Sequence, residues 1–191
     1  MRLLEDRIRA DGKVRSGDVL KVDGFLNHMI DVRFVAELGR EFYRLYKDCG
    51  VNKILTIESS GIGVACLTAQ FFDCPVVFAK KAKSKNIDAE TYSVPIASYT
   101  HGITSEVIVS KQYLGPGDRV LIIDDFLAKG NALLGLIKII RDSGAELAGA
   151  GIVIEKAYQD GGEKVRAEGV RVESLARIAS MSEEDGVVFC E

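Results

Sequence analysis

The stretch that decides the fold is VLIIDDFLAKGNA, Val120 to Ala132. Its first four residues, Val120 to Ile123, are apolar without alternation, which is typical of a strand buried on both faces of a sheet. Two carboxylates, Asp124 and Asp125, follow the strand. A loop of small residues comes next, and we expect a helix over Ala132 to Arg141.

The loop, Ala128 to Ala132, has the chemistry of a phosphate site. Gly130 can take a positive φ, so the loop can direct several backbone amides at one point. The N-terminus of the expected helix adds its positive dipole end. The glycine spacing is that of neither a P-loop nor a dinucleotide fingerprint.

Pattern alone leaves a second interpretation open, in which Asp124 and Asp125 only cap the turn and the helix. Because successive strand residues point to opposite faces, the two carboxylates need not meet one ligand unless the chain turns there.

The same alternation of strand and helix continues on both sides of this stretch. We expect a helix that starts at an Asp31 cap and ends at Gly50, strands at 54–57, 76–79, 106–109 and 150–154, and a helix at 63–72. Strand and helix in alternation predict an α/β fold, a mainly parallel sheet flanked by helices. Ligands of such sheets lie beyond the carboxyl ends of the strands.

Two further segments lie where ligands are expected. Glu58 to Gly63 follows a predicted strand and exposes backbone amides through small residues, a weak signal on its own. Lys80 to Ser98 is longer than an ordinary connection and holds four lysines within six residues, Lys80, Lys81, Lys83 and Lys85. We expect either a solvated face or a lid that brings cations to a phosphorylated ligand.

Length and charge narrow the choice of function. The chain has 191 residues, a length typical of a single domain, so residues 1–191 are expected to form one domain. A formal net charge of -3 gives no overall basic field, which argues against nucleic acid or an acidic membrane as a partner. No apolar run approaches the roughly 20 residues that span a bilayer, and Met1 to Arg15 lacks the apolar block of a signal peptide. We expect a cytoplasmic protein.

The cysteines Cys49, Cys66, Cys74 and Cys190 lack the close pairing of a zinc site or a redox dithiol. Cytosolic disulfides are rare, so all four are expected to be reduced and structural. Cys66 lies in an apolar stretch and is expected to be a small core residue.

The strand, acidic pair, loop and helix resemble the ribose-phosphate motif of the type I phosphoribosyltransferases. Within that family the resemblance is to the bacterial xanthine-using enzymes and runs nearly from end to end. The blocks that carry it are 20–23, 25–28, 56–61, 120–128, 151–156 and 172–178. It implies the family fold, with a small hood formed largely by residues 1–30 and the C-terminal segment.

The resemblance also implies a reaction and a set of roles. Xanthine would attack the anomeric carbon of phosphoribosyl pyrophosphate (PRPP), giving xanthosine monophosphate and diphosphate, with Mg²⁺ carried on the diphosphate and no residue of the chain assigned as a metal ligand. Asp124 and Asp125 match the pair that engages the ribose hydroxyls. The PRPP 5-phosphate would lie on Ala128, Lys129, Gly130, Asn131 and Ala132, and the pyrophosphate on Ser59, Ser60, Gly61 and Lys81. A homodimer is implied as well.

For the purine, the family pattern points to Leu20, Asn27 and Lys156. By its position Phe126 either stacks on the ring or is an ordinary core aromatic, which is the commoner role of such a residue. A lysine offers donors only, so it favours a 6-oxo group over the 6-amino group of adenine. Ala128 stands where hypoxanthine-guanine enzymes have an aspartate, and Thr100 to Ser105 lacks the carboxylate of the adenine enzymes. We therefore assign no general base.

Two alternatives remain open. One is an enzyme of the same fold for guanine, hypoxanthine or adenine; Asn27, Lys156 and the missing adenine-type carboxylate argue against it. The other is a non-catalytic regulator that senses PRPP. Such regulators generally carry an added DNA-binding module, and the segment before the first expected core helix leaves little room for one.

Overall fold

The computed structural model of the chain describes residues 1–82, 90–97 and 104–191. Its helical segments are α1 (Arg2–Asp11), η1 (Asp23–Asn27), α2 (Val32–Tyr46), η2 (Lys47–Cys49), α3 (Gly61–Phe72), η3 (Lys111–Tyr113), α4 (Asn131–Ser143) and α5 (Gly161–Ala167). Its strands are β1 (Lys13–Arg15), β2 (Val19–Lys21), β3 (Lys53–Ile57), β4 (Val76–Ala82), β5 (Thr91–Ala97), β6 (Thr104–Ser110), β7 (Arg119–Leu127), β8 (Glu146–Lys156), β9 (Val172–Ser182) and β10 (Gly186–Phe189).

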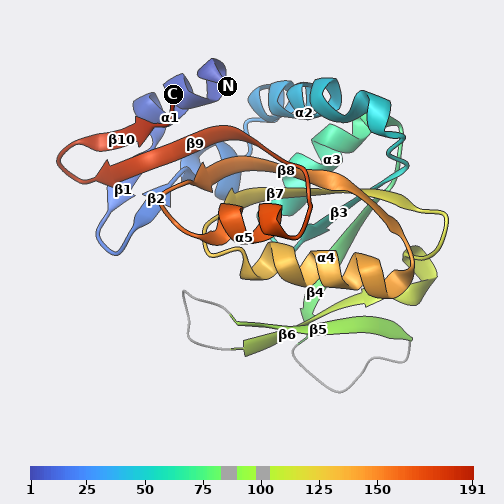
Figure 1. Cartoon of the computed structure of the whole chain (residues 1–191). Coiled ribbons are helices and arrows are strands. Elements are labelled where there is room, and N and C mark those ends of the chain that lie inside the picture. Colours follow the sequence, from blue (N-terminus) through green and yellow to red (C-terminus); the bar gives the residue numbers. More distant parts are fainter. Residues whose placement is uncertain (83–89, 98–103) are drawn as a thin grey trace.

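A central sheet organises the molecule. Its eight strands follow the order β10-β9-β8-β7-β3-β4-β6-β5, and β1 pairs with β2 in a separate hairpin. Strands β9, β8, β7, β3 and β4 are parallel, whereas β10, β6 and β5 are added antiparallel at the two sides. Helices α2 and α3 lie over one face, and α4 and α5 over the other (Figure 1). The predicted α/β class with a mainly parallel sheet is confirmed.

Each face of the sheet has its own apolar core. One core joins α1, η1, α2 and α3 to the sheet through residues such as Phe25, Leu38, Phe42 and Leu121. The other lies beneath α4, α5, β5 and β6. Strand β7 serves both, because Leu121 and Ile123 belong to the first core and Val120 and Ile122 to the second. This is the physical reason for its uninterrupted apolar run.

The expected helix after Asp31 is present as α2. The Asp31 carboxylate accepts a hydrogen bond from the backbone N–H of Phe34 at 3.1 Å, so it is the predicted N-cap. The helix ends at Tyr46, and the short η2 turn closes at Gly50 in the left-handed region with φ 65°. Helix α2 can lie close to β8 because Gly151 has no side chain. A Cβ at this position would lie only 2.7 Å from the Phe42 ring.

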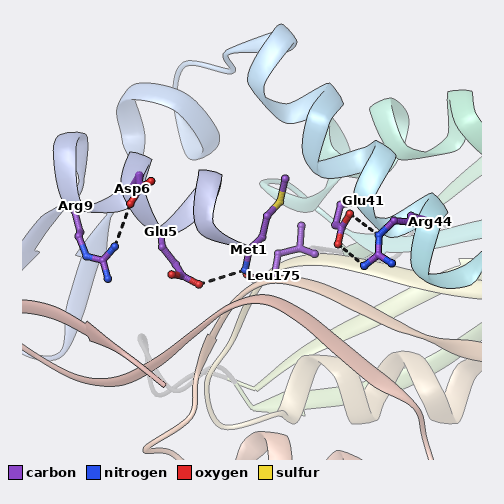
Figure 2. A network of polar contacts seen from close by, with 7 residues as sticks. All are labelled: Met1, Glu5, Asp6, Arg9, Glu41, Arg44 and Leu175. Atoms are coloured by element: carbon purple, nitrogen blue, oxygen red, sulfur yellow. Dashed lines mark hydrogen bonds and ion pairs between the residues drawn. The ribbon is translucent and has the colours of Figure 1, made fainter. Parts of the chain in front are cut away.

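The N-terminal elements pack on the C-terminal strands. Helix α1 contacts β9 and β10, as does β1. The Met1 amino group donates to the Leu175 carbonyl of β9 and pairs with Glu5 at 3.3 Å (Figure 2). Leu4 and Ile8 are buried in the first core. The N-terminal elements and the C-terminal strands are the segments from which the hood is expected to form.

Among the described residues, the helices are all too short or too polar to cross a bilayer.

Candidate active site

The acidic pair lies at the centre of the carboxyl edge of the sheet. Strand β7 continues to Leu127, so Asp124 and Asp125 stand inside the strand rather than just after it. Only 5% of Asp124 is exposed, and its Oδ1 accepts the backbone N–H of Asp125 at 3.0 Å. Burial raises the pKa of Asp124 well above its usual range, and the neighbouring Asp125 charge raises it further. Burial also raises the pKa of Asp125. The structure thus brings the two carboxyls to one place.

The loop between β3 and α3 closes against this pair. The Ser60 side chain lies near Asp125 and lowers the pKa of that carboxyl, partly offsetting burial. A Cβ on Gly61 would lie 2.9 Å from Asp124 Oδ1 and 2.2 Å from Thr56 Oγ1. Because Gly61 has no side chain, the first turn of α3 can pack directly against the acidic pair. The predicted pyrophosphate segment 59–61 and the predicted ribose pair are neighbours.

Glu58 and Lys81 complete that corner. The backbone N–H of Lys81 donates to Glu58 Oε1 at 2.7 Å, so β4 is fixed beside the loop. The peptide bond between Glu58 and Ser59 is cis. Lys81 also acts on Asp124, where its charge opposes the upward shift of the pKa. The predicted cation therefore comes from the strand beside this loop and lowers the pKa of Asp124.

The second amide loop links β7 to α4. Helix α4 begins at Asn131, so Asn131 and Ala132 belong to its first turn, one residue earlier than expected. Gly130 is the N-cap and takes φ 82°, as a converging loop requires. Ala128 and Lys129 are half-buried, and Lys129 Nζ lies 4.0 Å from a carboxylate oxygen of Asp160. The loop lies on the same edge of the sheet as the acidic pair.

This loop rests on Gly161, which sequence reasoning did not single out. The Gly161 N–H donates to the Ala128 carbonyl at 3.1 Å. A Cβ at Gly161 would come within 2.1 Å of that same oxygen and 2.6 Å of the Gly130 nitrogen. Only a glycine can support the loop at this distance.

The residues predicted for the purine lie at the end of β8 and in the N-terminal segment. Lys156 Nζ donates to the backbone carbonyl of Asp18 and lies 3.5 Å from its carboxylate, with 11% of the lysine side chain exposed. Leu20 is 6% exposed. Asn27 Oδ1 is buried and has no hydrogen-bond partner among the described residues. A buried acceptor without a partner calls for an explanation, and a donor on a bound ligand would provide one.

Phe126 is half-buried and packs against the first core. Its stacking on a purine stays a prediction.

The lysine-rich segment is not one long loop, so that expectation is wrong. Strand β4 extends to Ala82 and β5 occupies Thr91–Ala97, paired with β6 over its whole length. Lys80 and Lys81 are strand residues, whereas Lys83 and Lys85 lie outside the described residues. Val94 and Ile96 alternate with exposed Ser93 and Pro95, a strand signal that the proline and the polar neighbours concealed.

Cys66 is exposed on α3 and is not the core residue that its apolar neighbours suggested. Helix α3 is apolar on nearly every side, so apolar neighbours did not reveal which side faces the core. Buried positions of α3 are Val64, Ala65, Thr68 and Ala69, and Cys66 points away from them.

Sequence comparison identifies close relatives. The model of the phosphoribosyl transferase domain matches residues 26–179. A xanthine phosphoribosyltransferase of Lachnoclostridium phytofermentans is 58% identical over 188 residues, covering 98% of this chain and 97% of that protein. Xanthine phosphoribosyltransferase 2 of Clostridium botulinum is 53% identical over 190 residues, covering 99% and 100%.

Structural comparison agrees on the fold. The adenine phosphoribosyltransferase (APRTase) of Giardia lamblia, solved with 9-deazaadenine, superposes with a TM-score of 0.80 over 93% of this chain and 98% of that one. The two sequences are 22% identical, so this likeness concerns the fold alone.

Proposed function

Because the chain belongs to the phosphoribosyltransferase family, we propose that it is the enzyme that joins xanthine to PRPP, releasing diphosphate and xanthosine 5'-monophosphate in purine salvage. It is a pentosyltransferase. The observation that carries this conclusion is the identity of 50–58% with xanthine phosphoribosyltransferases over nearly the full length of both chains.

Asp124 and Asp125 would bind the ribose. We assign them to the two ribose hydroxyls, because paired carboxylates accept hydrogen bonds from a diol. As the bond to diphosphate lengthens, positive charge develops on the sugar, and buried carboxylates stabilise it more than water would. Their raised pKa values express the cost of keeping that negative charge in a buried place without ligand.

The two amide loops would hold the two phosphate ends of PRPP. We assign the 5-phosphate to Ala128, Lys129, Gly130, Asn131 and Ala132, where Gly130 and the first turn of α4 present backbone N–H groups. The pyrophosphate would bind to Ser59, Ser60, Gly61 and Lys81. Holding both ends fixes the anomeric carbon between them, and this positioning supplies much of the rate acceleration.

Lys156, Asn27 and Leu20 would bind the purine. Lys156 would donate to an oxo group, while Asn27 has a buried acceptor, Oδ1, without a partner among the described residues. The Leu20 backbone and the Phe126 ring would line the same space. No residue is assigned as a general base.

Mg²⁺ fits this site as an ion carried by the substrate. Mg²⁺ is usually held by one or two carboxylates together with substrate phosphates and water, and the acidic pair offers that donor type. The described part of the chain contains no group of three or more ligating side chains that could hold an ion by itself. When bound on diphosphate, the ion would neutralise the leaving group.

We further propose a cytoplasmic homodimer. Met29, Ile30 and Val32 are exposed by 59%, 43% and 59%, and such neighbouring apolar side chains favour an interface. Light scattering during size-exclusion chromatography would give a mass near 42 kDa for a dimer, twice the 20.8 kDa of the chain.

A substrate panel tests the proposed function. Purified protein with Mg²⁺ and PRPP would receive xanthine, guanine, hypoxanthine or adenine in turn, and release of diphosphate would be followed. We expect xanthine to have the highest kcat/KM. A preference for adenine would contradict the proposal, and the absence of turnover with every purine would favour a PRPP-sensing regulator.

A further inference from the structure

Asp18 connects the N-terminal hairpin to the turn after β8. It lies between β1 and β2 with φ 64°, in the left-handed region. Its carboxylate accepts hydrogen bonds from Tyr158 Oη and Gln159 Nε2, and its backbone carbonyl accepts one from Lys156 Nζ. Three side chains more than 130 residues away thus converge on a single residue.

Two of these side chains share one oxygen. Asp18 Oδ2 accepts from Gln159 Nε2 and lies 3.5 Å from Lys156 Nζ. The ammonium of Lys156 and the carboxamide of Gln159 are therefore immediate neighbours. The backbone supports this arrangement, because the Gln159 N–H donates to the Lys156 carbonyl at 3.0 Å and closes a turn.

The oxygen of the Gln159 carboxamide, Oε1, has no hydrogen-bond partner among the described residues. A carboxylate only accepts hydrogen bonds, so the amide nitrogen must face Asp18 and Oε1 must point elsewhere. Oε1 is buried and has no hydrogen-bond partner among the described residues. A buried carbonyl without a partner costs free energy unless a ligand supplies a donor.

Lys156 also retains a donor. An ammonium has three N–H groups, of which one is directed at the Asp18 carbonyl and one at its carboxylate. Both of these contacts are to Asp18, and within the described part of the chain the third N–H is the one that a ligand would receive. A donor and an acceptor then lie side by side at the end of β8.

We propose that Gln159 is a specificity-determining residue: with Lys156 it binds a purine oxo group and the ring N–H next to it, and Asp18 is the positioning residue that aligns the two. This inference rests on the proposed function and deepens it. Xanthine has an oxo group beside a ring N–H on its six-membered ring. Adenine presents a 6-amino donor beside a ring acceptor, so both contacts would be mismatched, and a site that leaves buried polar groups unpaired rejects such a ligand.

The first test replaces Gln159 by methionine, which keeps the length and removes both polar atoms. Losing one such hydrogen bond to the substrate corresponds to roughly a tenfold change. We expect a rise of about tenfold in KM for xanthine, with KM for PRPP unchanged within about twofold. Gln70→Met, at an exposed position of α3, is the matched control.

The second test replaces Asp18 by glycine. Glycine accepts φ 64° without cost and keeps the backbone carbonyl, so only the carboxylate is lost. We expect KM for xanthine to rise again and KM for PRPP to stay constant. A purely structural tether would instead lower kcat for every purine and change both KM values.

The outcomes separate this inference from the function. Wild-type protein that uses xanthine, with Gln159→Met leaving KM for xanthine within twofold, would overturn the role of Gln159 alone. An equal rise in both KM values would do the same. Wild-type protein that does not use xanthine would overturn the proposed function itself.

Discussion

At Asp124, burial and catalysis have opposing requirements. The carboxyl is enclosed by β7 and the first turn of α3, where its charged form is unfavourable, as its raised pKa indicates. The proposed reaction needs negative charge at this place only when ribose is bound. The residue is therefore expected to reduce the stability of the protein without ligand.

Asp124→Asn should separate these two effects. The amide oxygen can still accept from the Asp125 N–H, while the charge is lost. A raised pKa means that stability is complete at low pH and is lost as pH rises through the folded value. We therefore expect the Tm at pH 8 to rise by about 3 °C, corresponding to roughly 1 kcal/mol, and kcat to fall about 100-fold.

Differential scanning fluorimetry and steady-state kinetics would measure both quantities. The gain in Tm should disappear at pH 4, where the wild-type carboxyl is protonated. Asp142→Asn, on the exposed side of α4, is the control. A lower Tm at pH 8 would contradict the argument.

Single residues differ in how far the sequence reveals them. Asp124 and Asp125 are adjacent at the end of an apolar run and Gly130 follows in the next loop, so a local pattern is enough to place them. Asp18 cannot be found this way. Its partners lie at the other end of the chain, and a lone aspartate after a glycine has the pattern of an ordinary turn.

Among the elements, β5 shows where pattern reading is limited. Its Tyr-Ser-Val-Pro-Ile core alternates, but Pro95 and the preceding lysines favour a loop by composition. Strand β5 forms because Val94 and Ile96 pack on Gly135 of α4 in the second core; a Cβ there would lie 2.4 Å from Ile96 Cδ1. This tertiary contact cannot be recognised from a local window.

The contact between α5 and the loop at Ala128 supports an element-level prediction. In Gly161→Ala the methyl group would collide with the Ala128 carbonyl and the Gly130 nitrogen. The loop must move, and we expect KM for PRPP to rise about tenfold while KM for xanthine stays nearly constant. Steady-state kinetics with each substrate varied would measure this.

Gly115→Ala is the matched control, because a Cβ there meets nothing within 4 Å. If Gly161→Ala left KM for PRPP unchanged, the loop would not depend on this support.

At the scale of the molecule, Glu155 connects three elements. It is 2% exposed on β8 and pairs with Arg166 of α5 at 2.7 and 2.8 Å. From β9, Ser174 donates to it at 2.6 Å and Arg177 lies 3.4 Å away. Burial alone would raise its pKa, but these partners together lower it.

Glu155→Gln should weaken the whole fold. Removing one partner leaves Arg166 with an incomplete set of acceptors, and we expect a loss of about 3 kcal/mol in urea unfolding at pH 7. A lowered pKa gives stability that is present above the ordinary glutamate pKa and lost as pH falls.

The difference between variant and wild type should therefore shrink at pH 4. Glu146→Gln, 65% exposed at the start of β8, is the control. A difference that does not depend on pH would assign the loss to packing instead.

The two outer strands of the central sheet also determine how the protein behaves when crowded. An unpaired strand edge is a template on which other chains aggregate. Strand β10 spans only Gly186–Phe189, and β5 carries Pro95, which cannot donate a backbone hydrogen bond. Both edges are thereby poor templates, so the folded protein is protected from edge-to-edge aggregation at high concentration.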